Sequence, residues 1–216
     1  ERVATAILAS LNQVFLVDKQ RIFVSGSIGI TVYPNDAKSA VDLLKSADQA
    51  MYLAKEKGRD GFNFFTPDIQ QAAEYRMRLT NDLRTALSLD QFSVYYQPIV
   101  DLTLERVVKA EALLRWNHPS LGFVPPDEFV LVAEKTGIIR SLTYWVLDNA
   151  LAEKASWSQK GGGETISVNI SAVNLHEKDF ESNLLALLEK HQVLPEDLVL
   201  ELTETSVMTD PENAMA

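Results

Sequence analysis

The stretch Ile166-Ser-Val-Asn-Ile170 is the most informative about the fold class. The stretch Leu198-Val-Leu-Glu-Leu202 repeats its pattern of alternating aliphatic residues. In each stretch the aliphatic residues alternate, so the polar residue, Asn169 or Glu201, points to the opposite face of the strand. These two residues are 32 positions apart, about one strand–helix repeat, which allows the strands to be parallel neighbours. The pattern predicts a sheet with one apolar face and one face that carries polar side chains, and the interior of a barrel would be such a polar face.

Strands alternate with helical stretches throughout the second part of the chain. The expected strands cover 94–100, 107–114, 166–171 and 198–203, and the expected helices cover 126–136, 142–158 and 180–192. This alternation is typical of a mostly parallel α/β sheet or barrel. We therefore assign the second part to the α/β class.

The first part follows a different order of elements. We expect a helix over 3–11, a strand within 22–32, a helix over 41–57 that ends at Gly58, and a short strand over 62–65. A charged helix over 68–90 is expected to connect the two parts in solvent. The predicted boundaries are therefore 1–66 for the first domain, 67–90 for the connecting helix and 91–216 for the second domain.

Composition limits the possible partners. The 216 residues carry a net charge of -10, and residues 67–216 hold 23 acidic but only 12 basic side chains. An acidic surface disfavours binding of a nucleic-acid polymer, because the phosphate backbone is negatively charged. An acidic domain that binds a phosphate ester needs a cation between its carboxylates and the phosphate. The chain contains no cysteine, and no apolar run approaches the roughly 20 residues of a membrane span. A cytoplasmic location fits best, for a free protein or for the cytoplasmic part of a membrane-anchored one.

A third expected strand also carries one side chain that can bind a metal, which is Glu111 in Val107–Leu114. An isolated carboxylate inside a barrel costs several kcal/mol, so a paired charge or a coordinated cation is the economical explanation. Oxygen ligands from Glu111, Asn169 and Glu201 suit Mg²⁺, Mn²⁺ or Ca²⁺ better than zinc. For any one of the glutamates, a strand end or a salt bridge is the competing explanation.

Five motifs in the second part, taken in order and spacing, resemble the EAL domain family. They are Tyr96-Gln-Pro-Ile-Val100, Glu111-Ala-Leu-Leu-Arg-Trp116, Pro126-Asp-Glu-Phe129 with Ala133-Glu-Lys-Thr-Gly137, Asn169-Ile-Ser171, and Glu201-Leu-Thr-Glu-Thr205. The resemblance implies a modified (β/α)8 TIM-like barrel, incomplete over these residues, that hydrolyses cyclic-di-GMP to linear pGpG.

The resemblance also implies roles for individual residues. Glu111, Asn169 and Glu201 correspond to ligands of Mg²⁺ or Mn²⁺, and Gln97 and Arg115 correspond to contacts with the dinucleotide. A further residue, Glu204, corresponds to a catalytic-site position that anchors the following active-site loop.

The first part resembles the C-terminal part of a GGDEF domain, which is an α+β nucleotidyl-cyclase-like fold. The motifs are Val24-Ser-Gly-Ser-Ile-Gly-Ile30, Ala47-Asp48, Ala50-Met-Tyr52 and Ala54-Lys-Glu-Lys-Gly-Arg59. The resemblance implies that Lys55 and Arg59 contact GTP phosphates, and four-residue spacing on a helix end would put both cations on one face. An alternative explains the two residues equally well: cationic side chains near the C-terminus of a helix are stabilised by the helix dipole.

Neither resemblance covers a complete site. We expect the Gly-Gly-Asp-Glu-Phe loop before Glu1, and the Asp-Asp, Lys and Glu of an EAL site after Ala216. The leading hypothesis is a tandem GGDEF–EAL phosphodiesterase that is a homodimer at full length, while the 216 residues alone are expected to be inactive and poorly folded. A non-catalytic cyclic-di-GMP receptor, and a diguanylate cyclase with a regulatory EAL domain, are the alternatives.

Overall fold

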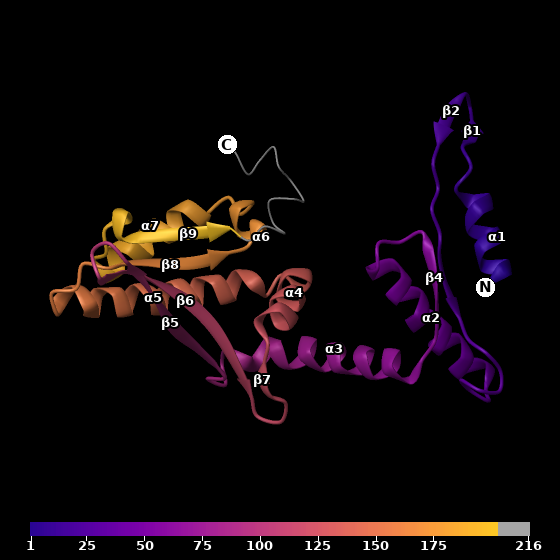
Figure 1. Cartoon of the computed structure of the whole chain (residues 1–216), viewed down its shortest axis with the longest axis horizontal. Coiled ribbons are helices and arrows are strands. Elements are labelled where there is room, and N and C mark those ends of the chain that lie inside the picture. The colour runs from indigo at the N-terminus through magenta and orange to yellow at the C-terminus, as the bar shows by residue number, and fades with distance from the viewer. Residues whose placement is uncertain (203–216) are drawn as a thin grey trace. The chain divides into compact units, whose positions relative to one another are not determined.

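The computed structural model describes residues 1–202 and divides the chain into two compact units, with the division between Arg78 and Leu79. The first unit contains the helices α1 (Arg2–Leu11) and α2 (Ala40–Glu56) and four short strands (Figure 1). Strands β1 (Phe15–Val17) and β2 (Gln20–Ile22) form an antiparallel hairpin. Strands β3 (Ser27–Ile30) and β4 (Gly61–Phe64) pair in parallel.

Strand β3 lies within the range 22–32 where a strand was expected, whereas the hairpin β1–β2 before it was not expected. Its turn residues, Asp18 and Lys19, adopt positive φ angles of 49° and 66° without a glycine to signal them. Helix α2 agrees with the expected helix to within one residue at each end. Its N-terminus is capped by Ser39, whose hydroxyl accepts a hydrogen bond from the backbone N–H of Asp42 at 3.1 Å.

Helix α3 (Pro67–Ala86) has a buried C-terminal part, which corrects the expectation of a solvated connecting helix. Leu79, Leu83 and Ala86 are at most 1% exposed. The side chain of Asp82 lies 2.9 Å from Nε2 of the buried His118. The last turns of α3 therefore belong to the core of the second unit, while the domain boundaries at 66 and 90 stay a prediction.

The second unit is built on a sheet with strand order β5-β6-β8-β9, and β7 (Gly122–Val124) pairs with β6. The four strands are β5 (Phe92–Asp101), β6 (Arg106–His118), β8 (Thr165–Ile170) and β9 (Leu198–Leu202). Strands β6, β8 and β9 are parallel, as expected, but β5 and β6 are antiparallel. A tight turn joins this pair, in which the Asp101 carboxylate accepts hydrogen bonds from the N–H groups of Thr103 and Leu104.

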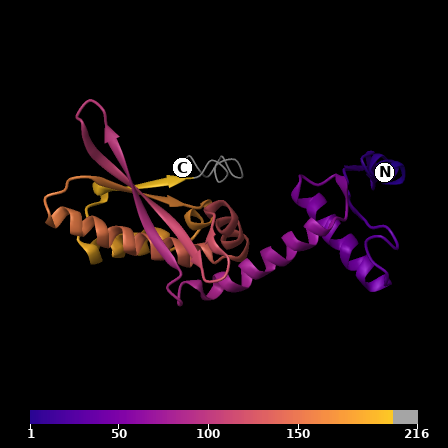
Figure 2. The same cartoon turned by 60° about the horizontal axis from the view of Figure 1, so that its bottom comes forward.

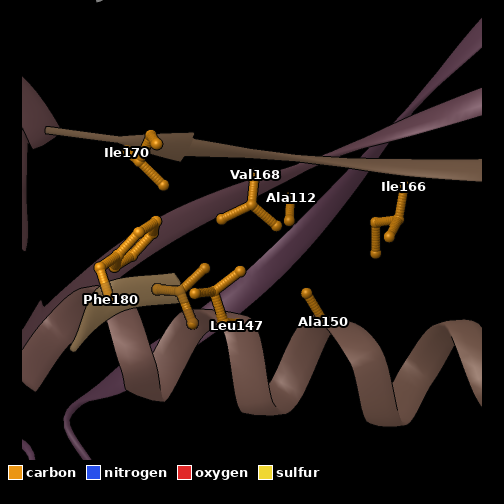
Figure 3. Packing of buried hydrophobic residues seen from close by; sticks show 8 residues of the cluster. Ala112, Leu147, Ala150, Ile166, Val168, Ile170 and Phe180 are labelled. Carbon is orange, nitrogen blue, oxygen red and sulfur yellow. The ribbon is translucent and has the colours of Figure 1, made fainter. Parts of the chain in front are cut away.

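One face of this sheet is covered by helices. Figure 2 shows α5 (Ile139–Gln159) running beside the strands, and Figure 3 shows its side chains packed against β8. The remaining helical elements are α4 (Pro126–Thr136), α6 (Ala172–Leu175), α7 (Phe180–His191) and a 3₁₀ turn (Pro195–Asp197). The core between sheet and helices is apolar and includes Ala112, Leu147, Ala150, Ile166, Val168, Ile170 and Phe180.

The sheet is not closed over the described residues, which agrees with an incomplete barrel. Aromatic side chains pack together where the first residues of β5 pair with the last residues of β6. The rings of Phe92 and Trp116 stack with their centroids 5.6 Å apart, and the ring of Phe129 lies 5.7 Å from both. Among the described helices, none combines the length and the apolar character that crossing a bilayer requires.

Candidate metal and dinucleotide site

The face of the sheet opposite the core carries a group of polar and charged side chains among a few apolar ones. Since side chains alternate along a strand, burying Ala112, Ile166 and Val168 on the helix side turns the intervening residues to the other side. These intervening residues include Tyr95, Gln97, Lys109, Glu111, Arg115, Ser167, Asn169 and Glu201. Four strands thus contribute hydrogen-bonding or charged groups to one surface.

Strand register brings the three expected metal ligands to neighbouring positions. Asn169 of β8 is the direct partner of Glu201 of β9. Glu111 of β6 is the partner of Ser167, two residues before Asn169 on the same face. Asn169 and Glu201 are both the penultimate residues of their strands, and parallel barrels place their active sites at this end.

Hydrogen bonds link these side chains in two pairs. Nδ2 of Asn169 donates to Oε1 of Glu111 at 2.7 Å, between residues 58 positions apart. Nζ of Lys109 donates to Oε1 of Glu201 at 2.5 Å, between residues 92 positions apart. This bond from Lys109 is the main reason that the pKa of Glu201 is lowered from its ordinary value.

The donor chemistry of this surface fits a divalent cation. Glu111 and Glu201 offer carboxylate oxygens and Asn169 offers an amide oxygen, which are the ligands that Mg²⁺ and Mn²⁺ prefer. Glu201 already attracts one cationic group, the ammonium of Lys109. Over residues 1–202 no cluster of three or more His, Cys, Asp or Glu side chains occurs, so the described donors are two carboxylates and one amide.

The two expected dinucleotide contacts lie on the hairpin. Gln97 is exposed on β5 directly opposite Glu111, so the antiparallel register brings it to the candidate ligands. Arg115 lies four residues beyond Glu111 on the same face of β6, roughly 13 Å along the strand. Its guanidinium donates to the carbonyl of Leu114 at 3.0 Å and lies 5.9 Å from the ring centroid of Tyr95. Glu204 lies outside the described residues.

Lys55 and Arg59 do not share a helix face, which corrects the geometric argument for a phosphate grip. Helix α2 ends at Glu56, and Gly58 and Arg59 follow with positive φ angles of 109° and 62°. The chain therefore turns away between the two cations. Both side chains are exposed, and their contact with GTP stays a prediction.

Lys109 is the residue of this site that sequence reasoning missed. Its position two residues before Glu111 puts both side chains on the same face of β6, and this spacing was the available signal. The sequence spacing of Lys109 and Glu111 could not predict that Lys109 pairs with Glu201 on β9, because this pairing depends on the register of three strands.

Comparison with known proteins bears on this site directly. A family model described as "EAL domain" matches residues 80–216. The chain belongs to the EAL domain family. A second model, "Diguanylate cyclase, GGDEF domain", matches residues 1–61, so the EAL domain is preceded by GGDEF sequence as the motifs indicated.

Two curated relatives match nearly the whole chain. The chain is 35% identical over 214 residues to "Bifunctional diguanylate cyclase/cyclic di-GMP phosphodiesterase MucR" of Pseudomonas aeruginosa, covering 99% of this chain and 31% of that protein. It is 34% identical over 216 residues to "Cyclic di-GMP phosphodiesterase PdeR" of Escherichia coli K12, covering 100% of this chain and 32% of that protein. The chain thus spans about a third of the length of these relatives.

Solved structures agree with the fold of the EAL domain. "PaMucR Phosphodiesterase, c-di-GMP complex" aligns with a TM-score of 0.59 at 37% identity, over 62% of this chain and 55% of that one. "Structure of EAL Enzyme Bd1971 - cGMP bound form" aligns with a TM-score of 0.60 at 26% identity, over 83% of this chain and 47% of that one. The similarity supports assigning the open sheet to part of the family's barrel.

Proposed function

We propose that the chain belongs to a metal-dependent phosphodiesterase that hydrolyses cyclic-di-GMP to pGpG. The observation that carries the proposal is that Glu111, Asn169 and Glu201 share one face of three adjacent parallel strands, where Asn169 bonds to Glu111 and is the register partner of Glu201. Relatives named as cyclic di-GMP phosphodiesterases, and a relative's structure described as a c-di-GMP complex, support the same substrate.

In this proposal Glu111, Asn169 and Glu201 hold Mg²⁺ or Mn²⁺. When bound, such a cation supplies Lewis-acid stabilisation of the negative charge that builds on the phosphoryl oxygens. Arg115 binds a phosphate through its planar fork of donors, and Gln97 orients the dinucleotide beside Glu111. Glu204 anchors the active-site loop, and Lys55 and Arg59 contact GTP in the GGDEF part. The homodimer and the cytoplasmic location also stay predictions.

The test replaces Glu111 in the full-length protein. Glu111→Ala removes a ligand from a polar surface and no apolar core contact, so we expect hydrolysis to fall at least about 100-fold while the melting temperature changes little. Glu189→Ala, which removes an exposed carboxylate from α7, is the matched control and should hydrolyse cyclic-di-GMP normally.

Three results would count against the proposal in different ways. Near-normal turnover by Glu111→Ala would exclude Glu111 as a metal ligand. Binding of cyclic-di-GMP by the wild-type protein without hydrolysis in Mg²⁺ or Mn²⁺ would instead favour the non-catalytic receptor. Formation of cyclic-di-GMP from GTP without its hydrolysis would favour the cyclase.

A further inference from the structure

Lys109 is bonded to one carboxylate oxygen of Glu201, which is a ligand of the proposed metal site. Its ammonium lies 2.5 Å from Oε1 of Glu201, and both side chains are partly buried, with 24% of Lys109 and 32% of Glu201 exposed. Because β8 lies between the two strands, the side chains of Lys109 and Glu201 must both reach across it to meet. Rigid strands therefore fix both ends of this ion pair.

An ammonium and a divalent cation cannot use this carboxylate oxygen together without cost. A divalent cation such as Mg²⁺ approaches its ligand oxygens to about 2.0–2.1 Å, which would bring it close to an ammonium that is hydrogen-bonded to the same atom. Two positive charges at such a separation repel each other strongly in a partly desolvated site. A cation bound to Oε1 of Glu201 must therefore displace Lys109, and a cation bound to the other oxygen, Oε2, still lies close to the positive charge of Lys109.

We propose that Lys109 is a built-in competitor of the divalent cation and lowers the affinity of the site by holding Glu201. The inference rests on the proposed function, because it takes Glu201 to be a metal ligand. Within residues 1–202 Glu111 forms no ion pair, and its Oε1 accepts a hydrogen bond from the neutral amide of Asn169. Lys109 and the cation therefore compete only for Glu201, on β9.

The expected size of the effect is moderate. An ion pair that remains partly exposed to water contributes little, so displacing Lys109 lowers metal affinity without abolishing it. Adding the repulsion between the displaced ammonium and the bound cation, we expect removal of the charge to tighten metal binding by about three- to tenfold. Lys109 would then set the metal concentration at which the site fills.

The test measures Mn²⁺ binding to the metal-free, full-length protein by electron paramagnetic resonance of free Mn²⁺. Lys109→Met keeps much of the stem and removes the charge, so its Kd should fall about three- to tenfold. Lys109→Arg keeps the positive charge and should stay within about twofold of the wild type. Lys160→Met, at the end of α5, changes the net charge equally outside the site and should leave the Kd unchanged.

Glu201→Gln separates failure of this inference from failure of the proposed function. If Glu201→Gln does not weaken Mn²⁺ binding, the metal site itself is wrongly placed, and the inference fails with it. If Glu201→Gln weakens binding but Lys109→Met matches the wild type or binds more weakly, the competitor role is refuted and the proposed function stands. Lys109→Ala provides the same measurement should Lys109→Met not fold.

Discussion

In the full-length protein, replacing Gly29 by alanine should markedly lower the melting temperature of the first unit. Gly29 lies in β3, where α2 packs directly onto the strand. A Cβ atom at this position would lie 1.8 Å from the carbonyl oxygen of Ala47 and 2.5 Å from the backbone nitrogen of Met51. Both obstacles are helix backbone, so no side-chain rotation can relieve the clash.

The magnitude follows from how far α2 must move. Restoring an ordinary contact distance requires a shift of roughly 1.5 Å or more of the helix away from the sheet, which loosens its whole packed face. Overpacking a core costs about 1–3 kcal/mol even where side chains can adjust, and we expect at least about 3 kcal/mol here. For a unit of this size, that corresponds to a lower melting temperature by at least about 12 °C.

Circular dichroism during heating measures the melting temperature, and hydrogen exchange of the α2 amides assigns the loss to the first unit. Gly61→Ala is the matched control, because its Cβ would lie 3.6 Å from the carbonyl oxygen of Arg59, an ordinary contact. A melting temperature for Gly29→Ala within about 2 °C of the wild type would refute the close packing of α2 on β3.

Two further predictions concern the second unit. Arg115→Lys replaces a planar fork of donors by a point charge, so cyclic-di-GMP binding should weaken by about 1–3 kcal/mol, and an unchanged Kd in titration calorimetry would contradict the contact. The pKa of Asp148 is lowered by hydrogen bonds from His191 and Lys190, both at 2.6 Å. This carboxylate therefore contributes stability above its ordinary pKa and loses that contribution as the pH falls through the lowered pKa. Asp148→Asn should destabilise the protein in urea at pH 7 but hardly at acidic pH below the lowered pKa, and an equal loss at both pH values would argue against the ion pair.

Local periodicity was sufficient to predict most elements of the second unit. The expected helix at 126–136 begins and ends as observed, and the strands near Asn169 and Glu201 are parallel neighbours. Alternation along each strand also placed the polar residues on the face opposite the core. These features depend on residues a few positions apart, which is the range over which a sequence pattern carries information.

The first unit and α3 show where local patterns are insufficient. The turn at Asp18 and Lys19 has no glycine signal, so the hairpin β1–β2 was not expected. The charged composition of α3 suggested a solvated helix, but Leu79 and Leu83 are buried by residues distant in the sequence. Arg59 does not share a helix face with Lys55, because the helix ends at Glu56 and the chain then adopts positive φ angles at Gly58 and Arg59.

The sequence by itself determined the family and the identity of the expected ligands Glu111, Asn169 and Glu201. Only the tertiary structure decided which side chains meet. The antiparallel register of β5 and β6 sets Gln97 opposite Glu111, and the order β6-β8-β9 brings Lys109 to Glu201 across 92 positions. Such pairings depend on long-range backbone hydrogen bonds and on core packing that positions whole strands, and neither of these is encoded in the spacing of neighbouring residues.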